Sequence, residues 1–150
     1  MTSKAAALFS AQLALILLLL AVPGPCWPVG ACTWPLPAGI LLSGFGTALF
    51  LLGLFALGHN LRPLPAPKSG GRLVTTGVYR RVRHPIYSGG LIAALGFALA
   101  TRSPMRLLWW AMLALVLDVK ARYEEELLSR RFAEYEDYRR KSRRFIPWVY

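Results

Sequence analysis

Acidic residues are scarce in this sequence of 150 residues, and they are confined to one end of it. The chain holds 7 Asp and Glu against 18 Lys and Arg, and all seven acidic residues follow Leu117. Cysteine is scarce as well, since Cys26 and Cys32 are the only two. Two cysteines exclude a disulfide-rich scaffold and are a weak basis for even one bridge, and no metal site is expected. No internal repeat is evident, which argues against a repeat array.

Apolar residues, by contrast, are abundant. Hydrophobic residues make up 55% of the chain, and the mean hydropathy is +0.43. This composition is typical of an integral membrane protein, and the length leaves room for one domain. The apolar residues fall into blocks at 5–22, 38–57, 86–101 and 105–119. We therefore expect an all-α membrane fold with about four transmembrane helices, the last two forming a hairpin across the short segment RSP.

The basic residues are placed as the positive-inside rule requires. The loop between the second and third blocks carries no acid, and its basic residues are Arg62, Lys68, Arg72, Arg80, Arg81 and Arg83. The loop between the first two blocks carries no charge at all. This predicts a multi-pass protein with both termini and the basic loop in the cytosol, although Arg102 and Arg106 then lie on the opposite side. Anionic lipid headgroups account for the basic loop, so membrane lipids rather than nucleic acid are the expected partners.

The first block also has a less favoured interpretation as a cleaved signal peptide. Lys4 precedes an apolar stretch of suitable length, but no A-x-A-like site follows it. Pro23, Gly24 and Pro25 are more typical of the end of a membrane span. We therefore expect the first block to be retained as a helix.

Charged and hydrogen-bonding side chains are concentrated in the stretch GVYRRVRHPIYSGG, residues 77–90. Pro85 suits the first turn of a helix, which places His84 at the cap and Tyr87 just inside the helix. The amide groups of that turn and the neighbouring arginines are suited to hold an anionic group. The alternative is that the arginines are snorkelling anchors and the tyrosines belong to an interfacial belt.

After residue 119 the sequence becomes charged. Apolar residues continue at helical spacing, which predicts that the fourth helix extends out of the membrane as a cytosolic amphipathic helix. Lys120 and Glu124 are four residues apart, as are Arg122 and Glu126. A solvated charged face is the favoured interpretation for Glu126, Glu134, Glu136 and Asp137. Glu124 differs from these in lying nearest to the membrane end.

Two separated motifs carry a resemblance to a known family. LVTTGVYRRVRHPIYSGG, followed after one hairpin by EEELLSRRFAEYEDYRRKSRRFIP, resembles the isoprenylcysteine carboxyl methyltransferase family in its wide sense, which includes bacterial relatives and phospholipid N-methyltransferases. The pattern G-x-Y-x-x-x-R-H-P-x-Y-x-G is matched by Gly77, Tyr79, Arg83, His84, Pro85, Tyr87 and Gly89. The second motif is matched by Glu124, Glu125, Phe132, Tyr135, Tyr138 and Pro147. The resemblance covers residues 70–150, about half of the chain.

The resemblance implies a membrane methyltransferase that uses S-adenosylmethionine without a Rossmann domain. Residues 1–150 would form one domain, with two membrane spans in 1–60 and the cofactor-binding core in 61–150. The cofactor contacts that it implies are Leu73, Val74, Tyr79, His84, Pro85, Ile86, Tyr87 and Glu124. Lys120 would bind substrate at a position where relatives that act on prenylated cysteine can have an arginine, and no catalytic residue is assigned.

The expected acceptor is a lipophilic small molecule or lipid that enters laterally from the bilayer. A prenylcysteine-like carboxylate, a phospholipid amine and a small thiol all remain open as its reactive group. Two other functions are compatible with parts of the sequence. One is an NADPH-dependent membrane reductase of the sterol or steroid type, disfavoured because Gly90 replaces the glutamate of that motif. The other is a membrane subunit without enzymatic activity.

Overall fold

A computed structural model describes residues 3–22, 35–58 and 73–147, and the regular elements in these ranges are helices, with no strand among them. The helices are α1 (Ser3–Ala21), α2 (Pro35–Leu57), η2 (Gly77–Arg80), α3 (Pro85–Ala100), α4 (Pro104–Arg131) and α5 (Tyr135–Lys141). The four predicted apolar blocks thus match helices to within three residues, except that α4 continues twelve residues past its block. The basic loop positions 62, 68 and 72 and both cysteines lie outside the described residues.

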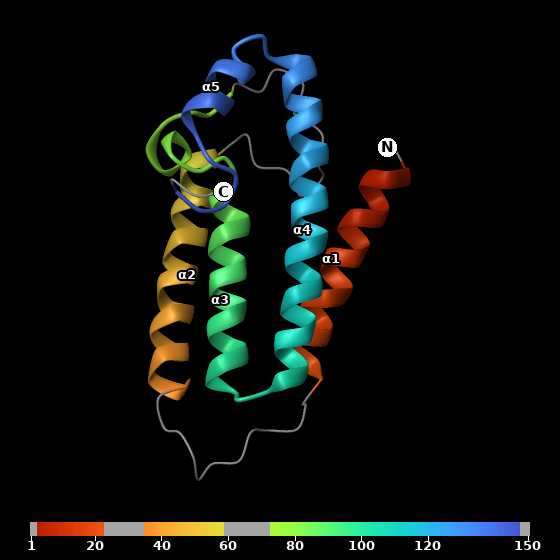
Figure 1. Ribbon diagram of the computed structural model, residues 1–150, viewed down its shortest axis with the longest axis vertical. Helices are drawn as coiled ribbons and strands as arrows, with labels where there is room; N and C mark the ends of the chain where they lie inside the picture. Colours follow the sequence, from red (N-terminus) through yellow and green to blue (C-terminus); the bar gives the residue numbers. More distant parts are fainter. Residues whose placement is uncertain (1–2, 23–34, 59–72, 148–150) are drawn as a thin grey trace.

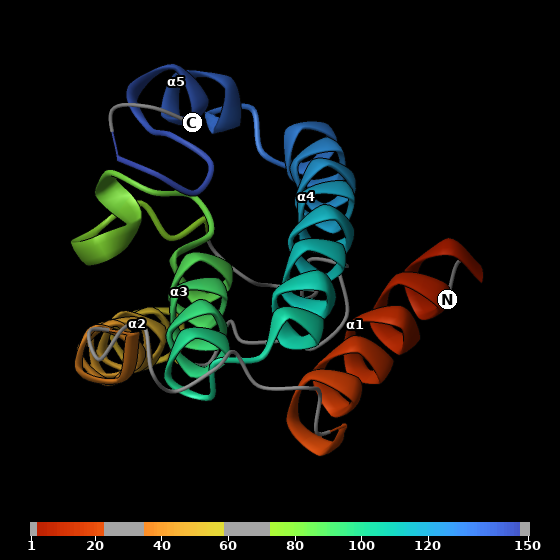
Figure 2. The ribbon, with the colours of Figure 1, turned by 60° about the horizontal axis from the view of Figure 1, so that its bottom comes forward.

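The four long helices form two antiparallel pairs, α2 with α3 and α1 with α4 (Figures 1 and 2). Between the pairs, α3 and α4 pack together as the predicted hairpin, and Trp110 Nε1 donates to Leu91 O at 2.8 Å. α1 and α2 are the outermost helices of the row. η2 and α5 lie at the end of the bundle where α3 begins, and α1 begins at the same end but on the far side of α4 (Figures 1 and 2).

Glycines determine how closely α2 and α3 approach. Gly39, Gly46 and Gly53 recur every seven residues on α2, opposite Gly89 and Gly96 of α3. A Cβ atom on Gly46 would overlap the backbone of Ala93 and lie 2.7 Å from Gly89 O. Two helix backbones can approach each other this closely only where glycine leaves no side chain between them. Small residues have the same role at helix–helix contacts in membranes.

The N-termini of α3 and α4 follow the sequence signals. Pro85 and Pro104 occupy the first turns of the two helices, and His84 is the N-cap of α3, as predicted. Ser103 is the N-cap of α4, and its side chain accepts from Arg106 N at 3.3 Å. The side chain of Arg106, expected on the uncharged side, donates to Leu19 O at 3.1 Å and lies 4.7 Å from the Phe97 ring centre. It therefore satisfies a carbonyl in the last turn of α1, which has no intrahelical partner of its own.

Large apolar side chains cover the outside of the bundle. Leu41 and Phe55 on α2 are 75% and 78% exposed, and Leu17 on α1 is 64% exposed. By length and composition, α1 and α2 are candidate membrane spans, whereas α3 is a shorter apolar helix. These outward-facing apolar helices indicate membrane association.

Replacing Gly46 by alanine is expected to destabilise the fold by about 1–3 kcal/mol, because the new methyl group forces α2 away from α3. Thermal unfolding in detergent, followed by circular dichroism, measures the effect. Gly44→Ala on the same helix is the control, since a Cβ there has no neighbour within 4 Å. Equal unfolding temperatures for the two variants would contradict the close glycine packing.

Candidate functional site

The C-terminal segment returns to the start of α3 and lies beside the RHP sequence. Arg83 N donates to Arg143 O at 2.7 Å, His84 N donates to Arg144 O at 3.1 Å, and Arg143 N donates to Arg81 O at 2.9 Å. Ser88 Oγ adds a bond to Phe145 O at 2.8 Å. The two motifs that were separated in the sequence therefore meet at one end of the bundle.

Glu125 is the centre of a buried charged cluster, which we call the carboxylate clamp: Arg83, His84, Glu125 and Arg144. The Glu125 side chain is 5% exposed, and its two oxygens accept from Arg144 Nε at 3.1 Å and Arg144 Nη2 at 3.0 Å. Arg83 Nε lies 3.0 Å from Glu125 Oε1, and His84 Nε2 lies 3.3 Å from the same atom. Burial alone would raise the pKa of Glu125, but the hydrogen bonds from His84, Arg144 and Arg83 outweigh it and hold this pKa well below its usual range.

The clamp changes the interpretation of Arg83. The sequence placed this arginine with Arg80 and Arg81 as a group able to hold an anionic ligand. Its guanidinium instead binds Glu125 and donates through Nη1 to Ser142 O at 2.7 Å. The Arg83 side chain therefore binds a carboxylate and a backbone carbonyl of the protein itself.

Beside the clamp, Glu124 contacts the other side of His84. Tyr87 Oη donates to Glu124 Oε1 at 2.6 Å, and His84 Nδ1 lies 3.6 Å from Glu124 Oε2. The His84 and Tyr87 rings stack with centres 5.3 Å apart and planes 4° apart. Glu124 is 18% exposed and Glu125 is 5% exposed. Glu124 is therefore the more accessible of the two carboxylates.

The other predicted cofactor residues precede Tyr87 in the chain, and the structure places them as follows. Pro85 and Ile86 lie against Gly53 of α2, and Leu73 and Val74 are half-buried upstream of η2. Tyr79 is buried, and its carbonyl accepts from Tyr138 Oη at 2.7 Å. Burial raises the pKa of Tyr138 to about 12, so its hydroxyl keeps the proton that it donates. The structure thus brings His84, Tyr87 and Glu124 into direct contact.

Lys120 lies one turn before Glu124 on α4 and is 3% exposed. Its ammonium donates to Gln12 Oε1 of α1 at 2.7 Å and lies 5.2 Å from the Tyr87 ring centre and 5.7 Å from that of Phe9. Nothing in the sequence connected α1 to this site. The predicted charged face is confirmed further along, where Glu126, Glu136 and Asp137 are exposed and pair with Arg130, Arg139 and Arg140 within four residues.

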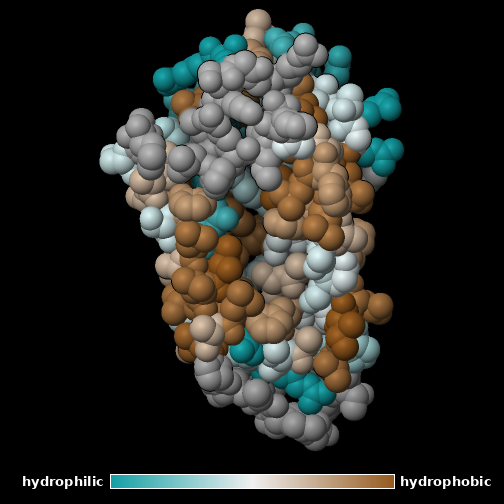
Figure 3. Space-filling view, turned by 180° about the vertical axis from the view of Figure 1, so that it is seen from behind, coloured by the Kyte–Doolittle hydropathy of each residue, from teal (hydrophilic) through white to brown (hydrophobic). Residues whose placement is uncertain are grey.

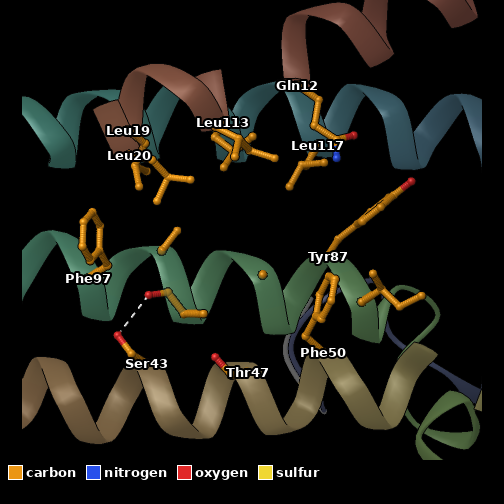
Figure 4. A pocket seen from close by; sticks show the side chains of 15 residues that line it. Gln12, Leu19, Leu20, Ser43, Thr47, Phe50, Tyr87, Phe97, Leu113 and Leu117 are labelled. Atoms are coloured by element: carbon orange, nitrogen blue, oxygen red, sulfur yellow. Dashed lines mark hydrogen bonds between the residues drawn. The ribbon is translucent and has the colours of Figure 1, made fainter. Parts of the chain in front are cut away.

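An apolar cavity of about 410 Å³ lies between the two helix pairs, and residues of α1, α2, α3 and α4 line it. Figure 4 shows Leu19, Leu20, Phe97 and Leu113 toward one end and Gln12, Leu117 and Tyr87 toward the other. Figure 3 shows a hollow between the helix pairs on a face that is largely hydrophobic along its middle. Tyr87 both lines the cavity and hydrogen bonds to Glu124, so it joins the cavity to the polar cluster.

Comparison with known proteins places this arrangement in a class of membrane methyltransferases. The profile of the phospholipid methyltransferase family matches residues 34–135. The match covers more than half of the chain, from the start of α2 to the start of α5. The chain therefore belongs to the phospholipid methyltransferase family, as its resemblance to the isoprenylcysteine carboxyl methyltransferases in their wide sense predicted.

Individual relatives agree with this assignment. The protein-S-isoprenylcysteine O-methyltransferase of Rattus norvegicus is 28% identical over 128 residues, 82% of this chain and 45% of the relative. A probable enzyme of the same name from Oryza sativa subsp. indica is 36% identical over 80 residues, 52% of this chain and 42% of the relative. The nickel-cobalt-cadmium resistance protein NccN of Alcaligenes xylosoxydans xylosoxydans is 37% identical over 76 residues, 50% of this chain and 36% of the relative. These alignments cover less than half of each relative's length.

Acidification is expected to lower the free energy of unfolding through Glu125. Its pKa is lower in the folded state than in the unfolded chain, where it is about 4.3. The clamp therefore stabilises the protein fully above that pH and loses its contribution as the pH falls further. Denaturant unfolding between pH 3 and 7 measures this loss. In the Glu125→Gln variant, the free energy of unfolding is predicted to lose most of its dependence on pH in this range. The Glu126→Gln variant, changed at an exposed site, is predicted to keep that dependence.

Proposed function

We propose that this chain is an S-adenosylmethionine-dependent methyltransferase that acts on a lipophilic acceptor at the cytosolic face of a membrane. The observation that carries the proposal is the position of Tyr87. Its ring lines the apolar cavity, while its hydroxyl donates to Glu124 at 2.6 Å. A membrane-facing site for an apolar molecule and a polar site suited to a cofactor are thus adjacent. Membership of a methyltransferase family supports this assignment of the two sites.

The chemistry of the residues fits the cofactor. Glu124 is partly exposed and can accept hydrogen bonds from hydroxyl or ammonium groups, which S-adenosylmethionine carries on its ribose and its methionine end. Tyr87 and Tyr79 add aromatic rings, the type of side chain that attracts a cation such as a sulfonium. We assign His84, Tyr87 and Glu124 as direct contacts, and Leu73, Val74, Tyr79, Pro85 and Ile86 as the surrounding wall.

When bound, S-adenosylmethionine supplies a methyl group on a positively charged sulfur. The acceptor's lone pair forms the new bond to the methyl carbon, and the electrons of the carbon–sulfur bond return to sulfur. Because the positive charge leaves sulfur in such an in-line displacement, positioning and exclusion of water would supply much of the rate. A carboxylate acceptor reacts without losing a proton, whereas an amine or thiol must lose one.

The acceptor's apolar part would occupy the cavity between the helix pairs, with its reactive group at the Tyr87 end. About 410 Å³ falls within the range of small-molecule sites. Lys120 and Gln12 stand at this same end, which supports a role for Lys120 in substrate binding. A prenylcysteine-like carboxylate, a phospholipid amine and a small thiol remain the candidate acceptor groups.

The proposed topology has four spans, α1 to α4, with the residues after the apolar part of α4 in the cytosol. The positive-inside pattern supports this orientation. The start of α1, η2 and α5 lie toward the same end of the bundle, which supports this topology (Figure 1). α3 would cross a locally thinned bilayer or be shielded from lipid by α2 and α4.

Binding of S-adenosylmethionine to the detergent-solubilised protein is the direct test. We expect wild type to bind it and Glu124→Ala to weaken binding by roughly tenfold or more, the cost of losing a charge-assisted hydrogen bond. Isothermal titration calorimetry measures both. Glu126→Ala is the matched control, because this neighbouring glutamate is exposed and pairs with Arg130.

The same binding experiment distinguishes a methyltransferase from the two other candidate functions. Binding of NADPH in place of S-adenosylmethionine would indicate the reductase, which the matched family does not support. Binding of neither compound to a folded sample would indicate a membrane subunit without enzymatic activity.

Filling the cavity is expected to block binding of the acceptor and to leave binding of the cofactor unchanged. Ala94 lines the cavity, so Ala94→Phe is predicted to reduce transfer of labelled methyl from S-adenosylmethionine into a total membrane lipid extract by tenfold or more, about the effect of a misplaced substrate. Ala111→Phe, on the exposed face of α4, is the control and should leave transfer unchanged. Unchanged transfer by Ala94→Phe would contradict the assignment of the cavity.

A further inference from the structure

Residues beyond the family match complete the site. The match to the family profile ends at residue 135, yet the segment that follows α5 runs beside the RHP sequence and hydrogen bonds to Arg81, Arg83, His84 and Ser88. Its charged contribution is the fork of Arg144 on Glu125. The Arg144 side chain is 13% exposed, whereas the neighbouring residue Arg143 is exposed.

Arg144 is connected to the proposed cofactor site through a short series of contacts. Glu125 accepts from both Arg144 and His84. The His84 ring lies between two aromatic rings, stacked on Tyr87 and tilted by 53° against Phe145 at 6.0 Å. Tyr87 in turn donates to Glu124. A shift of Glu125 therefore shifts His84, and through the stacked rings it shifts the hydroxyl that orients Glu124.

The geometry points to Arg144 as a positioning residue of the methyl-transfer site, which acts through Glu125 and His84 on the Tyr87–Glu124 contact. Its guanidinium is suited to this because a planar fork fixes both oxygens of a carboxylate, whereas a lysine ammonium fixes only one. The inference rests on the proposed function, because it assigns Glu124 to the cofactor.

The contacts of Arg144 also provide a way to separate positioning from stability. Besides Glu125, its Nη1 lies 3.0 Å from Asp118 Oδ1 on α4. Asp118 also pairs with Arg122, which lies one turn further along α4. Loss of the Asp118 contact loosens the attachment of the segment but leaves the fork on Glu125 in place.

The test compares S-adenosylhomocysteine affinity and thermal unfolding of the full chain in detergent. Arg144→Met is expected to weaken binding by roughly tenfold or more, since small displacements at a reacting centre have large effects. Arg144→Lys should be folded and give an intermediate loss, because it keeps the charge without the fork. Arg143→Met removes the same charge from the adjacent residue and should bind as wild type. Asp118→Asn should lower the unfolding temperature and change affinity less than twofold.

Two results would overturn the inference. One is wild-type affinity in the folded Arg144→Lys and Arg144→Met variants. The other is an equal loss in Asp118→Asn, which would mean that affinity follows stability alone. Absence of binding in folded wild type would refute the proposed function itself, and this inference with it.

Discussion

One buried carboxylate organises the end of the bundle where α3 begins. Glu125 accepts from two arginines and a histidine, and these partners come from the start of α3 and from the segment after α5. Removing a carboxylate and its partners from water is costly unless the geometry is close and the hydrogen bonds are complete. Both oxygens of Glu125 are engaged here, and one of them has three donors. The clamp is therefore a strong constraint on how the C-terminal segment meets the helices.

The adjacent carboxylate has a different environment, although it differs by only one position in the sequence. Neighbouring residues on a helix point about 100° apart, so Glu124 and Glu125 lie on either side of the His84 ring. Glu125 is enclosed by arginines, whereas Glu124 meets Tyr87 and keeps some exposure. One glutamate thus secures the structure, and the other is available to a ligand. The glycine-packed α2–α3 pair supports both, because it fixes the position from which Tyr87 projects.

Much of the fold could be predicted from local patterns. The apolar blocks predicted α1 to α4, and Pro85 with His84 predicted the start of α3, because these signals act within one helix turn. The clamp could not be predicted this way, since Glu125 meets partners 19 and 42 residues away and helical spacing indicates only partners within four residues. The seven-residue spacing of Gly39, Gly46 and Gly53 was a usable signal for close packing on α2. The cavity depends on how the two helix pairs are set apart, and no local pattern encodes that distance.

The central claim is that the cofactor binds where His84, Tyr87 and Glu124 meet. Ultraviolet cross-linking of methyl-labelled S-adenosylmethionine to the solubilised protein, followed by peptide mapping, tests it most directly. We predict labelled peptides that contain residues 73–87 or the part of α4 around Glu124, and loss of labelling when unlabelled S-adenosylhomocysteine is added. Competed labelling confined to other regions of the chain would contradict the account.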